Sequence, residues 1–177
     1  MKAHLQILAL TTILIAGCND AQQSPENAPL QFDLINTQNV KIGDLYLTSL
    51  DNDSVQVRVE AVSISPGAHG IHLHENGSCE TPDFKSAGGH INPMQKAHGL
   101  DNPDGPDNAD MPNAIADADG MVKFEYINER VSFVGTVGKP ALFDENGSAL
   151  VIHADPDDGV SQPIGGAGPR IACAVIR

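Results

Sequence analysis

The segment Val55-Gln-Val-Arg-Val-Glu-Ala-Val62 alternates apolar and polar side chains over almost its whole length. Successive side chains of a β-strand point to opposite faces, so this two-residue period predicts a strand with one face in a core and the other in water. The 177-residue chain contains 17 Gly, 12 Pro and many short Val, Ile and Leu clusters, but no long apolar stretch at helical spacing. These features predict a single all-β domain.

Similar short segments continue on both sides of this strand. The predicted strands span residues 30–36, 43–50, 55–62, 69–75, 114–118, 121–127, 131–137, 149–154 and 170–176. Asp119-Gly120 separates two of them and is a dipeptide favoured in tight hairpins. About eight or nine short strands at this turn-punctuated spacing predict a Greek-key β-sandwich or flattened barrel.

Two intervals without strand patterns, residues 76–112 and 155–169, are rich in Gly, Pro, Asp and Asn. Loops of this length inside a compact domain are uncommon, and they are usually either functional or disordered. We therefore expect two long functional loops attached to the barrel.

Residues 1–17 have the pattern of a secretory signal, because Lys2 precedes an apolar run that is too short to span a bilayer. The run ends in Ile15-Ala-Gly-Cys18, which resembles the bacterial lipoprotein signal. We expect removal of residues 1–17, a lipid on Cys18 and a flexible spacer over residues 18–29. The alternative is an ordinary signal peptidase site. Asn19 favours the outer membrane by analogy, with the protein in the bacterial periplasm and held to the membrane only by its lipid.

The chain carries 10 basic and 23 acidic residues, a formal net charge of −13. This charge argues against nucleic acid as a partner, since nucleic-acid binding depends on basic side chains. It also repels small anions at long range, so any anion chemistry requires a local positive patch.

Histidines cluster in a pattern that suits metal binding. In His72-Leu-His74 the two imidazoles lie two residues apart on a predicted strand and therefore share one face. His90 and His98 follow in the first long loop, and His153 ends a later strand. A single strand histidine is more often structural, but His-x-His with further loop histidines favours a metal site.

The residues around these histidines closely resemble the copper,zinc superoxide dismutases of the bacterial periplasmic or lipoprotein type. The resemblance covers residues 30–177 and implies the conversion of superoxide to dioxygen and hydrogen peroxide. It rests on five motifs in order: Gly67-Ala-His-Gly-Ile-His-Leu-His-Glu-Asn-Gly-Ser-Cys79, Gly88-Gly-His-Ile-Asn-Pro93, Asp110-Met-Pro112, Val151-Ile-His-Ala154 and Gly165-Gly-Ala-Gly-Pro-Arg-Ile-Ala-Cys173.

The resemblance implies a copper ion held by four histidines, with one of the four also bridging to zinc. Nitrogen donors suit copper in both valences, and two cations stabilise a bridging imidazolate. The implied copper ligands are His72, His74, His90 and His153. His90 is the implied bridge and proton carrier, and Arg170 is implied to hold the superoxide anion beside copper. The alternative for Arg170 is a surface charge near a disulfide.

Further residues take supporting roles by the same resemblance. Asp157 is expected to link His72 and His98 and so to orient both rings. His69 is expected to order the strand that carries the copper ligands. Cys79 and Cys173 match the family's intradomain disulfide, and a lipid on Cys18 would leave them as the only possible pair among three cysteines.

The zinc site departs from the family pattern. His90, His98 and Asp110 match three of the four expected ligands, but Asp107 stands where the family has histidine. Asp107 is expected to complete a site of two histidines and two aspartates, because zinc accepts carboxylate oxygen. The alternative is that zinc is weakly held or absent. The aspartates at positions 101, 104, 107 and 110 also suggest a calcium site, but the loop lacks the EF-hand pattern. A solvent-exposed acidic loop is the better interpretation of this spacing.

Two other functions compete with the enzyme. A copper-buffering lipoprotein on the same fold would need the copper ligands, but it has no need for Arg170 or Asp157. A purely structural lipoprotein would leave the clustered histidines unexplained. The enzyme is favoured, with superoxide as its substrate, copper and zinc as its cofactors, and either a monomer or a homodimer as its assembly.

Overall fold

The computed structural model describes residues 28–177, and this part of the chain contains nine β-strands, one 3₁₀ helix and no α-helix. The all-β prediction is therefore confirmed. The elements are β1 (Leu30–Asn36), β2 (Lys41–Ser49), β3 (Val55–Ala61), β4 (Gly67–His69), β5 (Ile71–His74), η2 (Lys85–Ala87), β6 (Ala114–Ala116), β7 (Val122–Asn128), β8 (Ser148–His153) and β9 (Arg170–Ile176).

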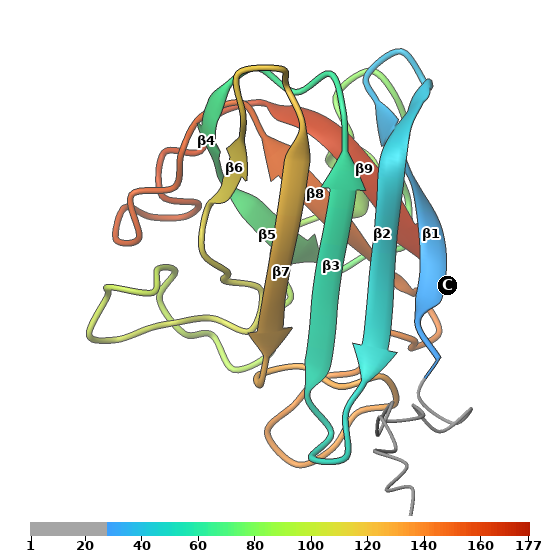
Figure 1. Cartoon of the computed structure of the whole chain (residues 1–177). Helices are drawn as coiled ribbons and strands as arrows, with labels where there is room; N and C mark the ends of the chain where they lie inside the picture. Colours follow the sequence, from blue (N-terminus) through green and yellow to red (C-terminus); the bar gives the residue numbers. More distant parts are fainter. Residues whose placement is uncertain (1–27) are drawn as a thin grey trace, which may run out of the picture.

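All nine strands belong to one antiparallel sheet, in the order β4-β6-β7-β3-β2-β1-β9-β8-β5. Its two edge strands, β4 and β5, follow one another in the chain with only Gly70 between them. The sheet must therefore curl until its two edges come together, which gives the flattened barrel of Figure 1. The predicted barrel architecture is confirmed.

The prediction of one continuous strand over residues 69–75 is wrong, because Gly70 divides this part of the chain into β4 and β5. The chain changes partners at this glycine, because β4 pairs with β6 and β5 pairs with β8. The Gly70 amide donates to the Asp155 carbonyl at 2.9 Å, and the Gly70 carbonyl accepts from the His153 amide at 2.8 Å. A Cβ atom at Gly70 would lie 2.8 Å from the Cβ of Ala167. Glycine is needed here because the loop after β8 packs directly against the backbone.

The alternating segment that suggested the fold forms β3 and lies in the middle of the sheet. Val55, Val57 and Val59 are fully buried in the main core. The hairpin between β6 and β7 turns at Gly120, whose φ of 76° lies in the left-handed region that favours glycine. Both features agree with the sequence prediction.

The predicted strand over residues 131–137 is wrong. This segment forms a loop with only isolated bridges, and Val134 and Val137 are 82% and 104% exposed. Thr136 and Lys139 exchange backbone hydrogen bonds, so the segment folds back on itself. Gly135 and Gly138 permit this turn with positive φ values. The apolar composition of this segment was misleading because it has no partner strand to pair with.

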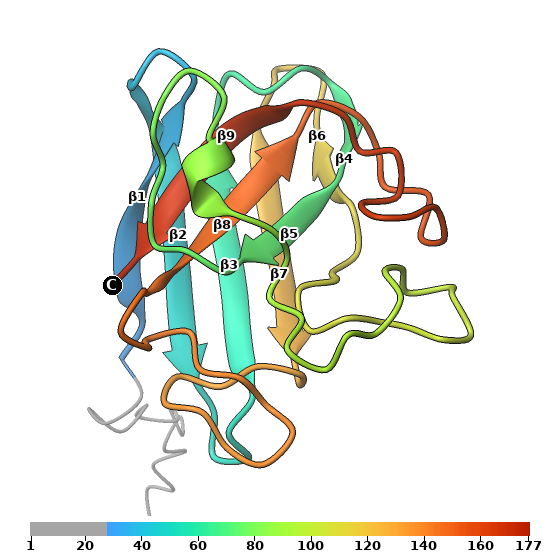
Figure 2. The same cartoon turned by 180° about the vertical axis from the view of Figure 1, so that it is seen from behind.

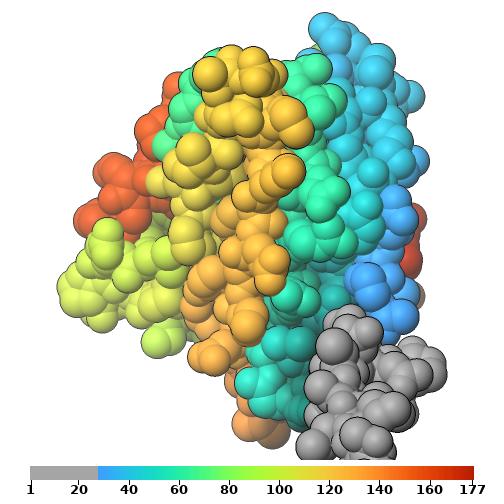
Figure 3. Space-filling view, in the orientation of Figure 1, coloured from blue at the N-terminus to red at the C-terminus, as the bar shows by residue number. Residues whose placement is uncertain are grey.

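The two predicted long loops gather on one side of the barrel. The first connects β5 to β6 and passes over the outer face of β8 and β9, where η2 lies (Figure 2). Phe84 and Ala87 of this loop pack on Ala149, Val151 and Cys173 in a second apolar cluster outside the barrel. The remainder of this loop and the loop before β9 project together from the body of the molecule (Figure 3). Functional side chains can therefore be enclosed between sheet and loops.

A disulfide between Cys79 and Cys173 ties the first loop to β9 across 94 residues. In the chain-entropy model, a closed loop of this length stabilises the folded state by about 4 to 5 kcal/mol. We expect a protein with both cysteines replaced by serine to lose about this much unfolding free energy. Urea titration of the oxidised and serine proteins measures the difference, and equal midpoints with equal slopes would contradict it.

The expected signal segment, Cys18 and most of the spacer lie outside the described residues. Within residues 28–177, no helix has the length and apolar character needed to cross a membrane.

Candidate metal centre

The histidine pair on β5 faces away from the barrel interior. Antiparallel pairing places His72 opposite Val151 and His74 opposite Ala149, whose side chains belong to the outer apolar cluster. The intervening Leu73 is buried in the main core. Both imidazoles are nevertheless fully buried, because the long loops cover this outer face. The predicted convergence of His72 and His74 is found.

A local irregularity at the end of β8 directs His153 to the same place. The register between β8 and β9 shifts between Ile152 and His153, so that His153 lies opposite Arg170. Such irregularities change the direction of a strand side chain and are common beside active sites. The ring centroid of His153 lies 5.1 Å from that of His72. Strands β5, β8 and β9 therefore supply three histidines and one arginine to a single region.

The first long loop brings His90 and His98 to this cluster. An isolated antiparallel bridge joins His90 to His74, and the Ile91 amide donates to the Leu73 carbonyl at 3.1 Å. The His90 ring centroid is 4.3 Å from that of His72 and 5.3 Å from that of His98. All five histidines predicted as ligands are therefore assembled, with His90 in the middle.

Six buried atoms in this cluster have no hydrogen-bond partner, although unsatisfied buried polar atoms are costly and rare in folded proteins. They are His72 Nδ1, His74 Nε2, His90 Nε2, His153 Nε2, His98 Nδ1 and Asp110 Oδ1. The last two lie 2.6 Å from each other, which is ion-pair distance, so the four other ring nitrogens are the ones without any partner. One ligand atom from each of His72, His74 and His153 lies within 4.8 Å of the others, as does one from each of His90, His98, Asp107 and Asp110. These atoms have the arrangement of two neighbouring sets of metal ligands.

The opposite nitrogens of the same rings are held in place. His74 Nδ1 donates to the Gly88 carbonyl at 3.0 Å, and His153 Nδ1 donates to the Gly168 carbonyl at 3.0 Å. His69 lies beside the end of β8, with its ring nitrogens 2.8 Å and 2.7 Å from the carbonyl oxygens of His153 and Ser65. Fixing one ring nitrogen in this way determines which nitrogen is left for a metal.

Asp157 joins the two halves of the cluster, as expected. Its Oδ2 lies 2.8 Å from His72 Nε2, and its Oδ1 lies 3.1 Å from His98 Nε2. The pKa of Asp157 is lowered although burial opposes this, because both histidines and the Gly159 amide stabilise the carboxylate. The carboxylate therefore stays ionised and can hold both rings at once.

In both Asp107 and Asp110, one carboxylate oxygen accepts backbone hydrogen bonds and the other faces a histidine of the cluster. Asp107 Oδ1 accepts from the amides of Ala109 and Asp110, whereas Asp107 Oδ2 lies 2.9 Å from His90 Nδ1. Asp110 Oδ2 accepts from the amides of Gly99 and Asp107. Asp110 Oδ1 lies 2.6 Å from His98 Nδ1 without hydrogen-bond geometry. Each carboxylate thus fixes the turn with one oxygen and offers the other to the cluster.

Burial keeps the strand histidines neutral in the metal-free protein. It lowers the pKa of His72, lowers that of His74 well below the ordinary value, and lowers that of His153 to about 4. Neutral imidazoles can bind a cation without first losing a proton. These three residues are therefore ready as ligands at neutral pH.

The pKa of His98 is shifted in the opposite direction. Burial disfavours its charge, but Asp110 and Asp157 outweigh burial and raise the pKa of His98 to about 10 in the metal-free protein. A cation at Nδ1 must displace a proton below that pH. We expect zinc affinity at this site to rise by up to about tenfold per pH unit between about pH 6 and 9, measured by competition with a chromophoric chelator. An affinity independent of pH over that range would contradict this expectation.

Arg170 lies beside the cluster and is anchored by the disulfide-linked loop. Its two terminal nitrogens donate to the carbonyl oxygens of Phe84 and Gly88 at 2.7 Å and 2.6 Å. The Gly88 carbonyl also accepts from His74. The guanidinium is therefore fixed relative to the His74 ring, because both groups bond to the Gly88 carbonyl.

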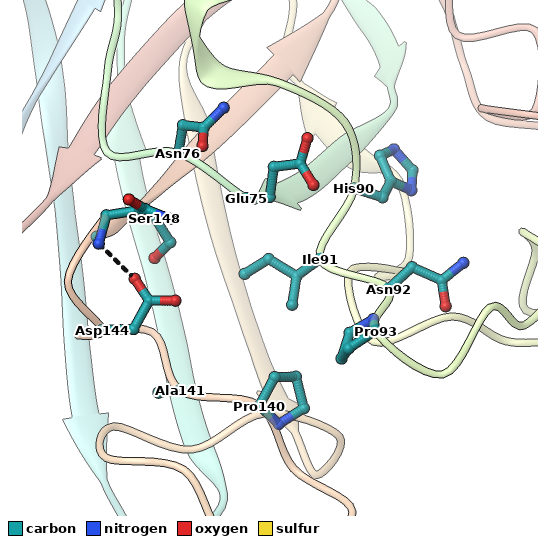
Figure 4. A pocket seen from close by; sticks show the side chains of 12 residues that line it. Glu75, Asn76, His90, Ile91, Asn92, Pro93, Pro140, Ala141, Asp144 and Ser148 are labelled. Carbon is teal, nitrogen blue, oxygen red and sulfur yellow. Dashed lines mark hydrogen bonds between the residues drawn. The ribbon is translucent and has the colours of Figure 1, made fainter.

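Two cavities adjoin His90 and Asn92, and they differ in the charged residues that line them. The cavity of about 420 Å³ over the cluster is lined by two basic residues, Lys96 and Arg170, and by one carboxylate, Asp107. The other, of about 320 Å³ and shown in Figure 4, has Glu75 and Asp144 in its lining and no lysine or arginine. An anion is attracted to the first and repelled from the second. The first cavity is therefore the candidate substrate channel.

The donor sets fit copper and zinc. Four imidazole nitrogens suit copper, and two imidazoles with two carboxylates form an acceptable four-coordinate zinc set. A shared imidazole, His90, can serve both because its two nitrogens face different groups: Nε2 is unpaired and Nδ1 faces Asp107. The fold and the site together define an antiparallel barrel protein with two adjacent metal sites.

Comparison with known proteins identifies the family. Residues 41–176 match the family model described as copper/zinc superoxide dismutase. The chain is 50% identical over 124 residues to a copper-zinc superoxide dismutase of Caulobacter vibrioides, covering 70% of this chain and 71% of the relative. It is 47% identical over 178 residues to superoxide dismutase [Cu-Zn] 2 of Aquifex aeolicus, covering both chains completely. The chain belongs to the copper/zinc superoxide dismutase family.

A solved structure supports the fold assignment. The crystal structure of a superoxide dismutase-like protein from Bacillus subtilis superposes with a TM-score of 0.80 at 36% identity, covering 85% of this chain and all of that one.

The structure also shows functional residues that the sequence analysis missed. Gln162 clamps the backbone of His98, accepting from its amide at 3.0 Å and donating to its carbonyl at 2.9 Å. Lys96 lines the candidate channel, where its position is fixed by two hydrogen bonds between its backbone and the Asn92 side chain. Neither residue belongs to a motif, so only the folded loops reveal them.

Proposed function

We propose that this chain dismutates superoxide, with copper bound by His72, His74, His90 and His153 and zinc bound by His90, His98, Asp107 and Asp110. The observation that carries the proposal is a pair of neighbouring groups of buried ligand atoms. One group comes from three histidines and the other from two histidines and two aspartates, and the ring of His90 in the second lies 4.3 Å from that of His72 in the first. Two superoxide anions and two protons give one dioxygen and one hydrogen peroxide. Bound copper supplies the one-electron chemistry, accepting an electron from one anion and giving it to the next.

The residues of the chain bind the anion and handle the protons. Arg170 provides a fixed positive charge beside the histidine cluster, which offsets the strong negative charge of the chain for a small anion that enters the channel. His90 Nε2 faces the cluster without a hydrogen-bond partner. It could hold a proton and deliver it to the reduced substrate, while Nδ1, on the side of the ring that faces Asp107, would stay with the zinc ligand set.

The relatives support the enzyme and give no support to copper buffering. The relatives from Caulobacter vibrioides and Aquifex aeolicus are named copper-zinc superoxide dismutases, and they match 70% and 100% of this chain. The test is the rate of superoxide decay with metal-free, copper-loaded and copper-and-zinc-loaded protein. We expect activity only with copper and a further effect of zinc. Copper-loaded protein that removes superoxide no faster than buffer would contradict the proposal.

The proposed zinc ligand Asp107 stands where the family pattern has histidine. Replacement by alanine removes an oxygen that faces His90 and also loosens the turn, so we expect weaker zinc binding by at least about tenfold. Asp107→His restores the usual family residue and should restore binding. Calorimetric zinc titration of the copper-loaded proteins measures both, and alanine and wild-type proteins of equal affinity would exclude Asp107 as a ligand.

We further propose that the mature chain is a periplasmic lipoprotein anchored through Cys18. The Ile15-Ala-Gly-Cys18 sequence supports this, and the disulfide at Cys79 suits an oxidising compartment. Mass spectrometry of the protein recovered from bacterial membranes should find a lipid on an N-terminal Cys18, and Cys18→Ser should abolish it. A mature chain that begins at another residue without lipid would contradict this proposal.

A further inference from the structure

The turn that carries Asp107 and Asp110 is attached to the end of β7 by an arginine that is not itself a ligand candidate. Arg130 Nε donates to the Asp107 carbonyl at 3.0 Å, and Arg130 Nη2 donates to the Asp110 carbonyl. One guanidinium therefore holds the backbone of both acidic residues at the mixed site. Arg130 is partly buried, which limits competition from water.

Two asparagines reinforce this attachment. Asn128, fully buried at the end of β7, donates to the Asn108 carbonyl at 3.0 Å and accepts from the Arg130 amide at 2.8 Å. Asn108 Nδ2 donates in return to the Arg130 carbonyl at 2.6 Å. Figure 1 shows the first long loop, drawn in yellow-green, passing beside the lower end of β7. The loop is thus joined to the barrel at the point where it presents its carboxylates.

The attachment determines where those carboxylates lie relative to the histidines. Because Asp107 and Asp110 each use one oxygen inside the turn, the turn is internally braced and can shift as a unit. His90 is positioned separately, by its pairing with β5. A small displacement of the turn would therefore move Asp107 and Asp110 away from His90 together. Arg130 opposes such a displacement, because its guanidinium bonds to the backbone carbonyls of both Asp107 and Asp110.

We propose that Arg130 is a positioning residue for the mixed metal site, acting through the forked hydrogen bonds of its guanidinium on the Asp107–Asp110 turn. The inference rests on the proposed zinc site and extends it to a residue outside the ligand set. Partners that orient metal ligands typically change metal affinity by 10- to 100-fold when they are removed. The guanidinium also places a positive charge near two buried carboxylates, so the test must separate geometry from charge.

The experiment uses copper-loaded protein titrated with Co²⁺, whose visible spectrum reports the geometry of the mixed site. The variants are Arg130→Met and Arg130→Lys, with Arg58→Met as the matched control on the outer face of β3, where Arg58 stacks on Tyr46. We expect both Arg130 variants to bind Co²⁺ about 10- to 100-fold more weakly with an altered spectrum. Before cobalt is added, the copper electron paramagnetic resonance spectrum should match wild type. Arg58→Met should match wild type throughout.

Three results would overturn the inference. Wild-type cobalt affinity in Arg130→Met would show that the contact is dispensable. Full affinity in Arg130→Lys with loss only in the methionine variant would assign the effect to charge. Equal weakening of copper and cobalt binding in both variants would show general destabilisation. Failure of the wild-type protein to bind Co²⁺ with this signature would instead refute the proposed second site, so the two failures can be told apart.

Discussion

A His153→Ala protein is expected to lose bound copper and to remove superoxide no faster than buffer does. His153 Nε2 is buried without a partner, while Nδ1 is held by the Gly168 carbonyl. The alanine variant keeps the β8 backbone but removes one of four nitrogen donors from a site whose other donors are fixed. Copper content after dialysis and the rate of superoxide decay measure the two losses.

The neighbouring His69 provides the control for this prediction. Both of its ring nitrogens already face backbone carbonyl oxygens, so it has no free donor for copper. His69→Gln should therefore retain one copper per chain, whatever it does to stability. If His153→Ala kept copper at wild-type stoichiometry, the proposed copper set would be wrong.

Charge reversal at Arg170 should have the second largest effect, lowering kcat/KM about 100-fold or more. The channel lies in a protein with a net charge of −13, so a glutamate at this position turns local attraction of the anion into repulsion. Arg170→Lys keeps the charge but cannot bond to both the Phe84 and Gly88 carbonyls in the same fork. We expect an intermediate rate for the lysine variant.

Superoxide decay at several ionic strengths checks this electrostatic account. Salt should slow the wild-type reaction if local attraction dominates, and it should accelerate the Arg170→Glu reaction. Lys123→Glu, an exposed charge reversal on β7 away from the channel, is the control and should cost far less than Arg170→Glu. Equal losses in the two variants would show that only total charge matters.

The barrel was largely predictable from the sequence, because the alternation of apolar and polar residues along a strand follows which of its two faces is buried. The alternation in β3 follows directly from one buried and one exposed face, and the spacing of His72 and His74 places both rings on one face whatever the rest of the fold. The disulfide partners and the acid Asp157 were available only through resemblance to a family. Their side chains meet across separations of 94 and 85 residues, which no local pattern encodes.

Other features depend on tertiary contacts that the sequence does not display. Gly70 divides a strand because the sheet must close on itself, and the irregularity before His153 depends on its pairing with β9. Residues 131–137 are rich in valine, as strands often are, but the segment makes only isolated bridges and pairs with no strand. The use of one oxygen of Asp107 for the turn and the other for His90 is a property of folded loops, as is the fork of Arg130.

The central claim is that two metal sites meet at the His90 imidazole, and one spectroscopic measurement tests it most directly. Cupric ion is placed in the histidine set and Co²⁺ in the mixed set, and the copper electron paramagnetic resonance signal is recorded before and after cobalt is added. The account predicts that the copper signal disappears as cobalt binds, because one imidazolate couples the two ions magnetically. A copper signal that persists unchanged after cobalt has bound stoichiometrically would show that His90 does not join the sites.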